Sequence, residues 1–359
     1  MEENAKIISE KRTPIKTPAD IVDENGNCVF GTFDGEFEKF SLTKAKKPTH
    51  LPQCFNRQKL TLWQAVEINF GEIMFLTAVC DMGIFGQTLT LVYDKETKKV
   101  TSFGGPMPKG RVSVAEKMTG GAKTSANGKN LSILFENNMQ RDEFALKGDI
   151  SKKSEKVSYD IVLTRAGSPS VVSIPFGKNR PLYSQKDLFT VKGSLTFGGK
   201  TYTADAETTA IVDDHRGYYP RRMAYDWVTA MGFYDTAEGK TPFGFNLTHN
   251  QSTDETDYNE NLIWLGKKRL PLPPVRFSRT VESRDFTSES VWTVKDEYGR
   301  VDIKFRAFGI NPMVIHALVV NIDYYFFFGC FEGTLRDEDG NIYSVDGMMG
   351  MGEDKSMLF

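Results

Sequence analysis

The stretch "TYTADAETTAIVDDHRG" (residues 201–217) carries the clearest structural signal in the chain, an alternation of small or apolar residues with polar ones. Even-numbered positions from Tyr202 to Val212 form one face, and odd-numbered positions form the other. A period of two is typical of a β-strand, whose side chains point alternately to the two sides of a sheet. The stretch therefore predicts one strand, and continued register places Asp214 on the apolar face behind Val212.

Short strands separated by turns extend along the rest of the chain. Glycine-containing turns such as "ANGKN" (126–130) and "DEYGR" (296–300) alternate with strand-like segments such as "EIMFLTAVC" and "VDIKFRAFGI". Glycine supplies the positive φ that tight hairpins require. No long window shows the 3.6-residue period of a helix. The sequence therefore predicts an all-β protein built from antiparallel sheets, as sandwiches or barrels.

The length of the chain bears on its division into domains. A chain of 359 residues is large for one closed barrel, so the sequence favours two tandem β units. The expected linker is "SIPFGKNRPLYSQKD" (173–187), which contains glycine and two prolines. The predicted division is a flexible N-terminal tail at residues 1–20, one β domain at residues 21–180 and a second at residues 181–359.

Composition excludes several classes of protein. The net charge is only -2 and no long basic run occurs, whereas nucleic-acid binding needs clustered cations. The opening lacks the apolar core of a signal peptide. The apolar stretch at residues 312–331 is interrupted by His316, Asn321 and Asp323, so no integral membrane segment is expected. With four scattered cysteines that favour reduced thiols, these features predict a cytoplasmic protein, whose oligomeric state the sequence leaves unknown.

Several candidate functional residues lie at the C-terminal end of the alternating stretch. A carboxylate at Asp214, on an apolar face, must be paired or protonated, because burial raises its pKa and a neighbouring arginine lowers it. Arg216 shares the face of Asp214. One interpretation is a buried ion pair, and the other is an acid tuned for proton transfer.

A second alternating stretch follows the break at Pro220. In "RRMAYDWVTAMGFY" (221–234), Tyr225 and Trp227 belong to a bulky face and Asp226 lies on the opposite one. The next predicted strand, "PFGFNLTHN", places Asn246 and Thr248 on one face. The polar run Asn259, Glu260 and Asn261 precedes a further strand.

These motifs resemble a known family. The order Asp-His-Arg-Gly, Tyr-Asp-Trp, then an aromatic-Asn-Leu strand is similar to the bacterial domain-of-unknown-function family numbered 2804. The similarity extends from "LPQCFNRQKL" (51–60) to "YSVDGMMGMGED" (343–354), and thus covers most of the chain from about residue 20. More remotely, it resembles the Asp-x-Glu-Trp-Gly and Trp-Asp-Trp signature of the carotenoid 1,2-hydratase and AttH-like group, from which it departs at Arg216, Gly217 and Tyr225.

The resemblance implies two tandem lipocalin-like (calycin) β units. The family motif falls on Asp214, His215, Gly217, Asp226 and Trp227. The predicted catalytic residues are Asp214, His215 and Asp226. The predicted ligand-binding residues are Arg216, Tyr218, Arg221, Tyr225, Trp227, Asn246, Asn259, Glu260 and Asn261.

Three functions fit these residues. The first is a carrier that holds an apolar small molecule, such as a lipid, terpenoid or polycyclic compound, in a β cavity. The second is a cofactor-free hydratase, isomerase or cyclase, in which Asp214 donates a proton, His215 orients it and Trp227 walls the cavity. The third is a carbohydrate-active protein that uses Asp214 and Glu260 as paired carboxylates.

No cofactor is predicted. A metal site from Asp213, Asp214, His215 and His249 has suitable ligand types but matches no short motif, so no metal is expected.

Overall fold

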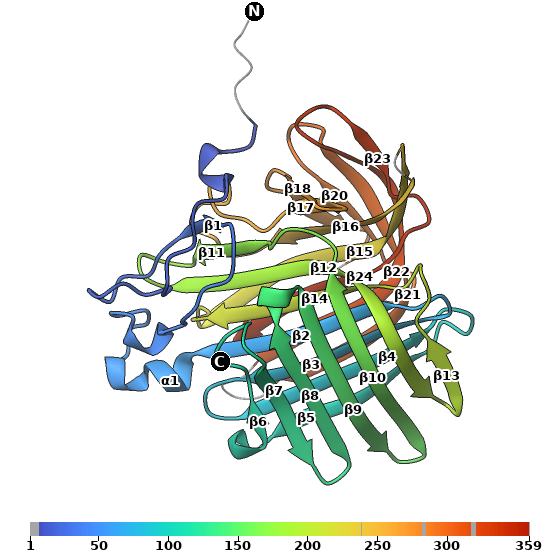
Figure 1. The fold of residues 1–359 in the computed structure, drawn as a ribbon, viewed down its shortest axis with the longest axis horizontal. Helices are drawn as coiled ribbons and strands as arrows, with labels where there is room; N and C mark the ends of the chain where they lie inside the picture. The colour runs from blue at the N-terminus through green and yellow to red at the C-terminus, as the bar shows by residue number, and fades with distance from the viewer. Residues whose placement is uncertain (1–6, 238, 282–284, 317–320, 359) are drawn as a thin grey trace, which may run out of the picture.

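The computed structural model describes residues 7–237, 239–281, 285–316 and 321–358, which form two curled antiparallel sheets (Figure 1). The prediction of an all-β chain with two tandem lipocalin-like units is confirmed. Helix is limited, in the described residues, to α1 (Asn56–Lys59) and short 3₁₀ turns. These turns are Glu10–Arg12, Leu42–Lys44, Gln53–Phe55, Lys109–Arg111 and Met139–Arg141.

The first sheet has 14 strands in the order β5-β4-β3-β2-β14-β12-β10-β9-β8-β7-β6, with β11 and β13 also paired to β12, and β1 paired to β11. Its strands are β1 (Gly31–Phe33), β2 (Thr61–Asn69), β3 (Ile73–Asp81), β4 (Gly86–Asp94), β5 (Val100–Met107), β6 (Val112–Ser113), β7 (Ala122–Gly128), β8 (Leu131–Asn138), β9 (Glu143–Lys152), β10 (Glu155–Arg165), β11 (Val171–Pro175), β12 (Pro181–Phe197), β13 (Lys200–Thr203) and β14 (Thr209–Gly217). The sheet curls until β6 packs near β3 and β5 near β9, so it nearly closes into a barrel around an apolar core.

The second sheet has ten strands in the order β18-β17-β16-β15-β24-β22-β21-β20-β19, with β23 paired to β22. Its strands are β15 (Arg222–Thr236), β16 (Gly239–His249), β17 (Leu262–Leu265), β18 (Lys268–Pro271), β19 (Arg276–Arg279), β20 (Val291–Lys295), β21 (Val301–His316), β22 (Asn321–Arg336), β23 (Ile342–Ser344) and β24 (Met349–Leu358). This open half-barrel encloses its own aromatic core, which includes Phe245, Trp292 and Phe327.

The two units pack against each other through their outer faces. Leu76 and Leu91 of the first sheet meet Trp227 and Phe326 of the second, and the rings of Tyr93 and Phe328 stack with centroids 5.0 Å apart. The central strands are consequently covered on both sides, which explains why β3 is buried along its whole length and reads as a continuous apolar run. The side chains between the two units are therefore buried.

The alternating stretch at residues 201–217 forms two strands, β13 and β14, rather than the single strand that was predicted. A turn separates them, in which Thr208 donates its hydroxyl proton to Asp205 at 2.8 Å and the amide of Glu207 also donates to Asp205 at 3.0 Å. A side-chain acceptor that satisfies local amides favours a turn over a continuous strand. The register after the turn is the predicted one, because Val212 and Asp214 point to the same side.

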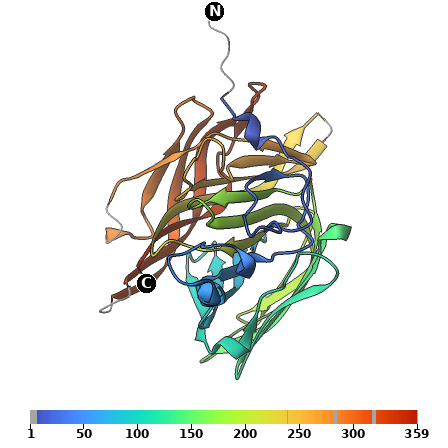
Figure 2. The same ribbon diagram turned by 90° about the vertical axis from the view of Figure 1, so that its left-hand side faces the viewer.

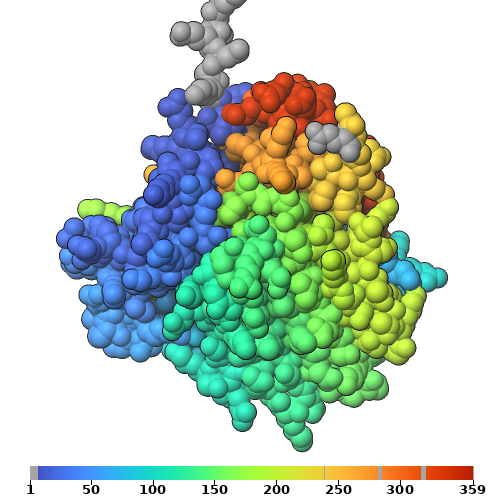
Figure 3. Space-filling model, in the orientation of Figure 1, coloured from blue at the N-terminus to red at the C-terminus, as the bar shows by residue number. Residues whose placement is uncertain are grey.

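The change from one sheet to the other falls between Gly217 and Arg222, whereas the predicted boundary at residues 180 and 181 lies within the first sheet. Within the predicted tail, Ile8 and Arg12 are buried against the body of the protein, so this segment is anchored rather than free. Figures 2 and 3 show these N-terminal residues, in blue, lying against the strands of the first unit and beside segments of the second. Residues 1–6 of that tail lie outside the described residues.

All four cysteines are free, as the sequence predicted for their spacing. Within the described residues, no helix combines the length and the apolar character that crossing a bilayer requires.

Candidate functional site

A narrow cavity of about 70 Å³ lies between the two units and brings titratable groups and aromatic rings together. Strands β2, β12 and β14 supply its residues from one side, and β15, β22 and β24 from the other. Its charged lining residues are Glu67, Lys186, Asp213, His215, Glu260, Glu353 and Lys355. Its aromatic lining residues are Trp63, Phe176, Tyr219, Tyr225, Trp227 and Tyr324. We call this space the interface cavity.

Strand alternation decides which residues of β14 reach the interface cavity. Asp213 and His215 point into it, while Asp214 points to the opposite side of the sheet. Lys186 lies directly across from Asp213 on the neighbouring strand β12. The Lys186 Nζ atom is 3.0 Å from the Asp213 Oδ2 atom and 4.7 Å from the centre of the Trp227 ring. A buried ammonium group thus sits between a carboxylate and an aromatic face.

Glu260 joins this pair to a hydrogen-bonded network. It accepts hydrogen bonds from Thr248 at 2.7 Å and from the Ser184 hydroxyl, and its Oε1 atom is 4.0 Å from the Lys186 Nζ atom. Burial by itself raises the pKa of Glu260, but Lys186, His215 and Ser184 lower it by more, so the pKa lies well below its usual value. Glu260 is therefore an ionised carboxylate at neutral pH.

His215 is the centre of the same network. Its Nε2 atom is 3.0 Å from the Ser184 hydroxyl, 3.4 Å from Asp213 and 3.5 Å from Glu260. Burial lowers the pKa of His215, but Asp213 and Glu260 outweigh burial and raise the pKa above its usual value. An imidazole between two carboxylates in this way can accept and return a proton near neutral pH.

Glu67 on β2 differs from the other acids of the interface cavity. It is buried, and its Oε2 atom has no hydrogen-bond partner among the described residues. Burial, followed by the negative charge of Asp213, raises the pKa of Glu67 well above its usual value. Two acids that share a buried site cannot both ionise easily, and Asp213 is the one of the two that is paired with Lys186.

A second group of polar side chains lies on the β24 side of the cavity. Glu353 accepts hydrogen bonds from the hydroxyls of Tyr225 at 2.8 Å and Tyr324 at 2.5 Å. Lys355 donates to the Tyr225 oxygen at 3.2 Å and lies over the Tyr324 ring, 4.8 Å from its centre. Burial lowers the pKa of Lys355 below its ordinary value. This side of the cavity is walled by ring faces around one cation.

Of the residues predicted from the sequence, four line the interface cavity: His215, Tyr225, Trp227 and Glu260. Asn246 stands directly behind this wall, because its side-chain oxygen accepts a hydrogen bond from the Trp227 indole at 2.6 Å. Asn261 supports the same region by accepting a hydrogen bond from the amide of Thr248 at 2.7 Å. Asn259 accepts a hydrogen bond from the amide of Asn261 at 2.9 Å and lines a different cavity.

Asp214 and Arg216 form a buried ion pair inside the first unit. The Arg216 Nε atom is 2.6 Å from Asp214 Oδ1, and the Nη2 atom is 3.0 Å from Oδ2. Gln64 also donates to Asp214, at 3.0 Å. The His215 ring contacts Ser184, Asp213 and Glu260 instead, so the contacts of the described residues do not support the expectation that His215 orients Asp214. Asp214 also lines neither cavity that Glu260 lines, so the two do not form a glycosidase pair.

The remaining predicted residues lie elsewhere. Tyr218 is buried in the first unit and donates its hydroxyl proton to the carbonyl of Leu42 at 2.9 Å. Arg221 is exposed. Asp226, opposite Trp227 on β15 as predicted, forms an ion pair with Arg279 in the second unit.

Sequence reasoning missed Glu67, Lys186, Glu353 and Lys355. Glu67 had a usable signal, because in "TLWQAVEIN" it shares one alternating face with Trp63 and Ala65. The logic that singled out Asp214 as an acid on an apolar face would have singled out Glu67 as well. Lys186 and Lys355 gave no such signal, since lysine is common on exposed strand faces.

Metal binding has no support from this arrangement. Over the described ranges, no three or more histidine, cysteine or acidic side chains are grouped so that they could hold a metal ion. Of the four residues considered for such a site, Asp213 and His215 lie on one side of β14 and Asp214 on the other, and His249 lies on β16 near Asp226 and Glu255.

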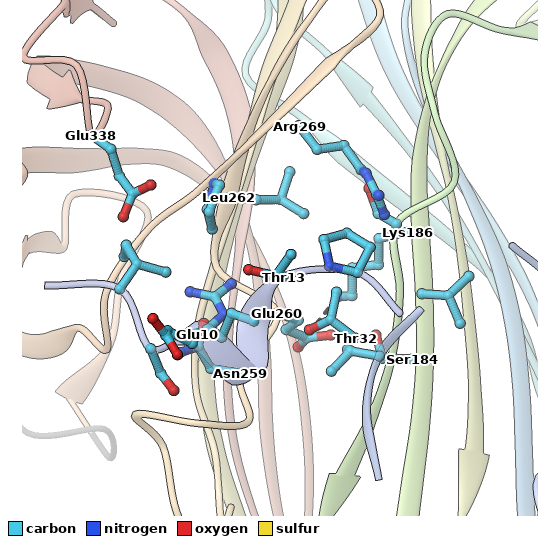
Figure 4. Close-up of a pocket in the computed structure, with 18 of the residues that line it drawn as sticks. Glu10, Thr13, Thr32, Ser184, Lys186, Asn259, Glu260, Leu262, Arg269 and Glu338 are labelled. Atoms are coloured by element: carbon cyan, nitrogen blue, oxygen red, sulfur yellow. Dashed lines mark hydrogen bonds and ion pairs between the residues drawn. The ribbon is translucent and has the colours of Figure 1, made fainter. Parts of the chain in front are cut away.

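Lys186 and Glu260 also line a second, larger cavity of about 590 Å³, shown in Figure 4. We call it the outer cavity. It lies under the N-terminal segment and includes Arg12, Thr32, Ser184 and Asn259. The buried charge network therefore forms a wall shared by two cavities.

Comparison with known proteins places the chain in a family. No curated protein matches the sequence. Among solved structures, kievitone hydratase from Nectria haematococca is similar, with 14% identity, a TM-score of 0.44 and coverage of 83% of this chain and 88% of that chain. An AttH-like protein from Nitrosomonas europaea has 12% identity, a TM-score of 0.46 and coverage of 85% and 96%. Residues 12–359 match the model of the domain of unknown function DUF2804, and the chain belongs to that family, as its motifs predicted.

Proposed function

We propose that this protein is a cofactor-free acid–base enzyme of the hydro-lyase or isomerase type, acting on a largely apolar small molecule at the interface between its two units. The observation that carries the proposal is Glu67, a buried carboxyl group in a cavity lined by aromatic rings, with an Oε2 atom that has no hydrogen-bond partner among the described residues and a pKa that burial raises. A carboxylic acid that keeps its proton at neutral pH is a suitable proton donor.

The chemistry follows from the groups around Glu67. Glu67 gives its proton to one carbon of a double bond, and positive charge develops on the other carbon. The faces of Trp63, Trp227 and Tyr324 stabilise that charge. Water then adds to the second carbon and loses a proton to the nearby carboxylate of Asp213, from which Glu67 is reprotonated. The reverse sequence eliminates water, and loss of a different proton instead of water addition gives isomerisation.

The remaining groups set the protonation states. Lys186 pairs with Asp213 at 3.0 Å, so that one of the two neighbouring acids has a counter-charge and the other does not. His215 connects Asp213 with Glu260 and supplies a second route for the returning proton. A carrier needs few charges, and burying so many is costly unless they act on the ligand.

The size of the interface cavity limits what enters without movement. About 70 Å³ holds a few water molecules or the reactive end of a substrate, whereas cavities for whole small ligands are usually several hundred Å³. The lining includes Met82, Met223, Met313 and Met357. Unbranched methionine side chains adapt to different shapes, so these residues allow the cavity to widen around a ligand.

Binding without catalysis is the second candidate function, favoured by the outer cavity. Its volume of about 590 Å³ falls in the range of small-molecule sites. A carrier would hold its ligand there and use the charge network only as a structural wall.

One experiment separates the two functions. The protein is purified from its native source and denatured, and mass spectrometry identifies the compound that is released. That compound is then incubated in D₂O with the wild type, with Glu67→Gln and with Glu72→Gln, a control at an exposed glutamate. We expect deuterium at carbon with the wild type and the control, and none with Glu67→Gln.

Two outcomes contradict the enzyme. If the wild type binds the compound but transfers no deuterium, the protein is a carrier. If denaturation releases only sugars or nucleotides, the apolar substrate is ruled out for both candidate functions.

A further inference from the structure

The outer cavity contains guanidinium groups that have no carboxylate partner among the residues that the structure describes. Arg12 is buried, with only 6% of its surface exposed. Its guanidinium donates to two main-chain carbonyls, those of Leu272 and, at 2.7 Å, Asn261, and its Nε atom has no partner within the described residues. No ion pair joins Arg12 to an acid in the described part of the chain. Burial lowers the pKa of Arg12 to about 9.

Two further arginines of the outer cavity share this property. Arg269 donates to the carbonyls of Pro169 and Phe33, and Arg300 has an Nη1 atom without a hydrogen-bond partner among the described residues. Burial lowers the pKa of Arg269. Both residues, like Arg12, line the outer cavity.

Other buried arginines of this protein are paired with acids. Arg165 forms ion pairs with Glu36 and Asp187, and Arg216 forms one with Asp214. A buried charge without a counter-charge is costly, and folded proteins usually pair it. Arg12, unlike Arg165 and Arg216, is buried without an acidic partner in the described residues. This is typical of an arginine whose counter-charge comes from a ligand.

The rest of the outer cavity is suited to an apolar body. Its apolar lining residues are Ile7, Ile8, Pro14, Val171, Val172, Leu262 and Pro271. Two acids at its rim, Glu10 and Glu338, lie in Figure 4 on the opposite side of the view from Lys186 and Arg269. Glu338 is exposed, and it raises the pKa of Arg12 by less than burial lowers it.

We propose that the outer cavity binds an amphipathic organic acid, with its carboxylate on Arg12 and its apolar body against the isoleucine, valine and proline side chains. Arginine suits this role because its planar fork can donate two hydrogen bonds to one carboxylate. The site is separate from the interface cavity and goes beyond the proposed function. Lys186 and Glu260 line both cavities. A ligand in the outer cavity therefore lies against the same charged side chains that line the interface cavity.

The test compares two ligands of equal chain length, dodecanoate and dodecan-1-ol, by isothermal titration calorimetry at pH 7. We expect the wild type to bind dodecanoate at least about tenfold more tightly than the alcohol, because hydrogen bonds to charged groups are worth more than neutral ones. Arg12→Gln should remove this preference and leave the affinity for the alcohol unchanged. Arg111→Gln, at an exposed arginine outside the cavity, is the matched control and should bind both ligands as the wild type does.

A second variant guards against misfolding, because Arg12 also holds two main-chain carbonyls. Arg300→Gln removes no side-chain hydrogen bond in the described residues, and it should weaken dodecanoate but not the alcohol. Equal wild-type affinities for the two ligands would overturn the proposal, as would an unchanged preference in a folded Arg12→Gln protein. Displacement of dodecanoate by inorganic phosphate, with no binding of the alcohol, would show a simple anion site and also overturn it. Glu67→Gln should bind dodecanoate normally, so failure here is distinguishable from failure of the proposed enzyme.

Discussion

Asp213 and Asp214 are neighbours in the sequence, but they serve opposite sides of the same sheet. Asp213 faces the interface cavity and pairs with Lys186 at 3.0 Å, while Asp214 faces the interior of the first unit and pairs with Arg216 at 2.6 Å. The two pairs therefore have different consequences, one for the chemistry of the cavity and one for the stability of the first unit.

Asp214→Asn should destabilise the protein by about 3–5 kcal/mol, because it leaves the buried Arg216 without its counter-charge. Asp213→Asn is the matched comparison and should cost less, since Lys186 still has Glu260 at 4.0 Å. Urea unfolding of both variants measures the difference. Equal losses of stability, or a larger loss for Asp213→Asn, would contradict the structural role given to Asp214.

Glu67→Gln should change the pH dependence of stability. The pKa of Glu67 is raised in the folded state, so the folded protein retains a proton that the unfolded chain releases above its ordinary pKa. Wild-type stability therefore falls, by up to about 1.4 kcal/mol per pH unit, as pH rises from about 4.5 toward the raised pKa. Glutamine does not titrate, so the variant should gain stability relative to the wild type over that window. A constant difference from pH 4 to pH 8 would contradict the raised pKa.

His215 should titrate above its ordinary pKa of about 6.5. A histidine whose pKa is raised in the folded state stabilises the protein fully at pH values below its pKa in the unfolded chain. This stabilisation is lost as the pH rises through its pKa in the folded state. NMR titration of the imidazole signals, assigned with His215→Gln, measures the pKa directly. We expect the His215 signal to move at higher pH than an unperturbed histidine would, and a midpoint at or below pH 6.5 would refute the network around it.

Asp354→Asn should stabilise the protein above pH 6. Burial, with Asp226 and Asp323 nearby, raises the pKa of Asp354 to about 6, although Arg279 opposes the shift. The wild type loses stability between about pH 4 and pH 6, and the variant should exceed it by about 2–3 kcal/mol at pH 7. Thermal unfolding at pH 3.5 and pH 7 checks this. Asp337→Asn is a control of opposite sign, because hydrogen bonds from Asn341 and Tyr343 outweigh burial and lower the pKa of Asp337.

Much of the fold could be predicted from local patterns. The predicted alternation of side chains through Val212 and Asp214 is present in β14, and the alternation through Tyr225 and Trp227 is present in β15. The turn at Asp205 was missed, because its side-chain hydrogen bonds interrupt a pattern that alternation alone would continue. The family was also accessible, since its motifs are contiguous in sequence.

The sequence by itself determined the strands and divided their residues into two faces, because side-chain direction in a strand depends only on position along the chain. Only the tertiary structure decided which face meets which neighbour. Both faces of β2 and β14 are buried, one in the first unit and one between the units, so an apolar face did not identify the cavity. Glu67, Lys186 and Lys355 come from strands far apart in sequence, and packing of the two sheets, which no local pattern encodes, brings them together.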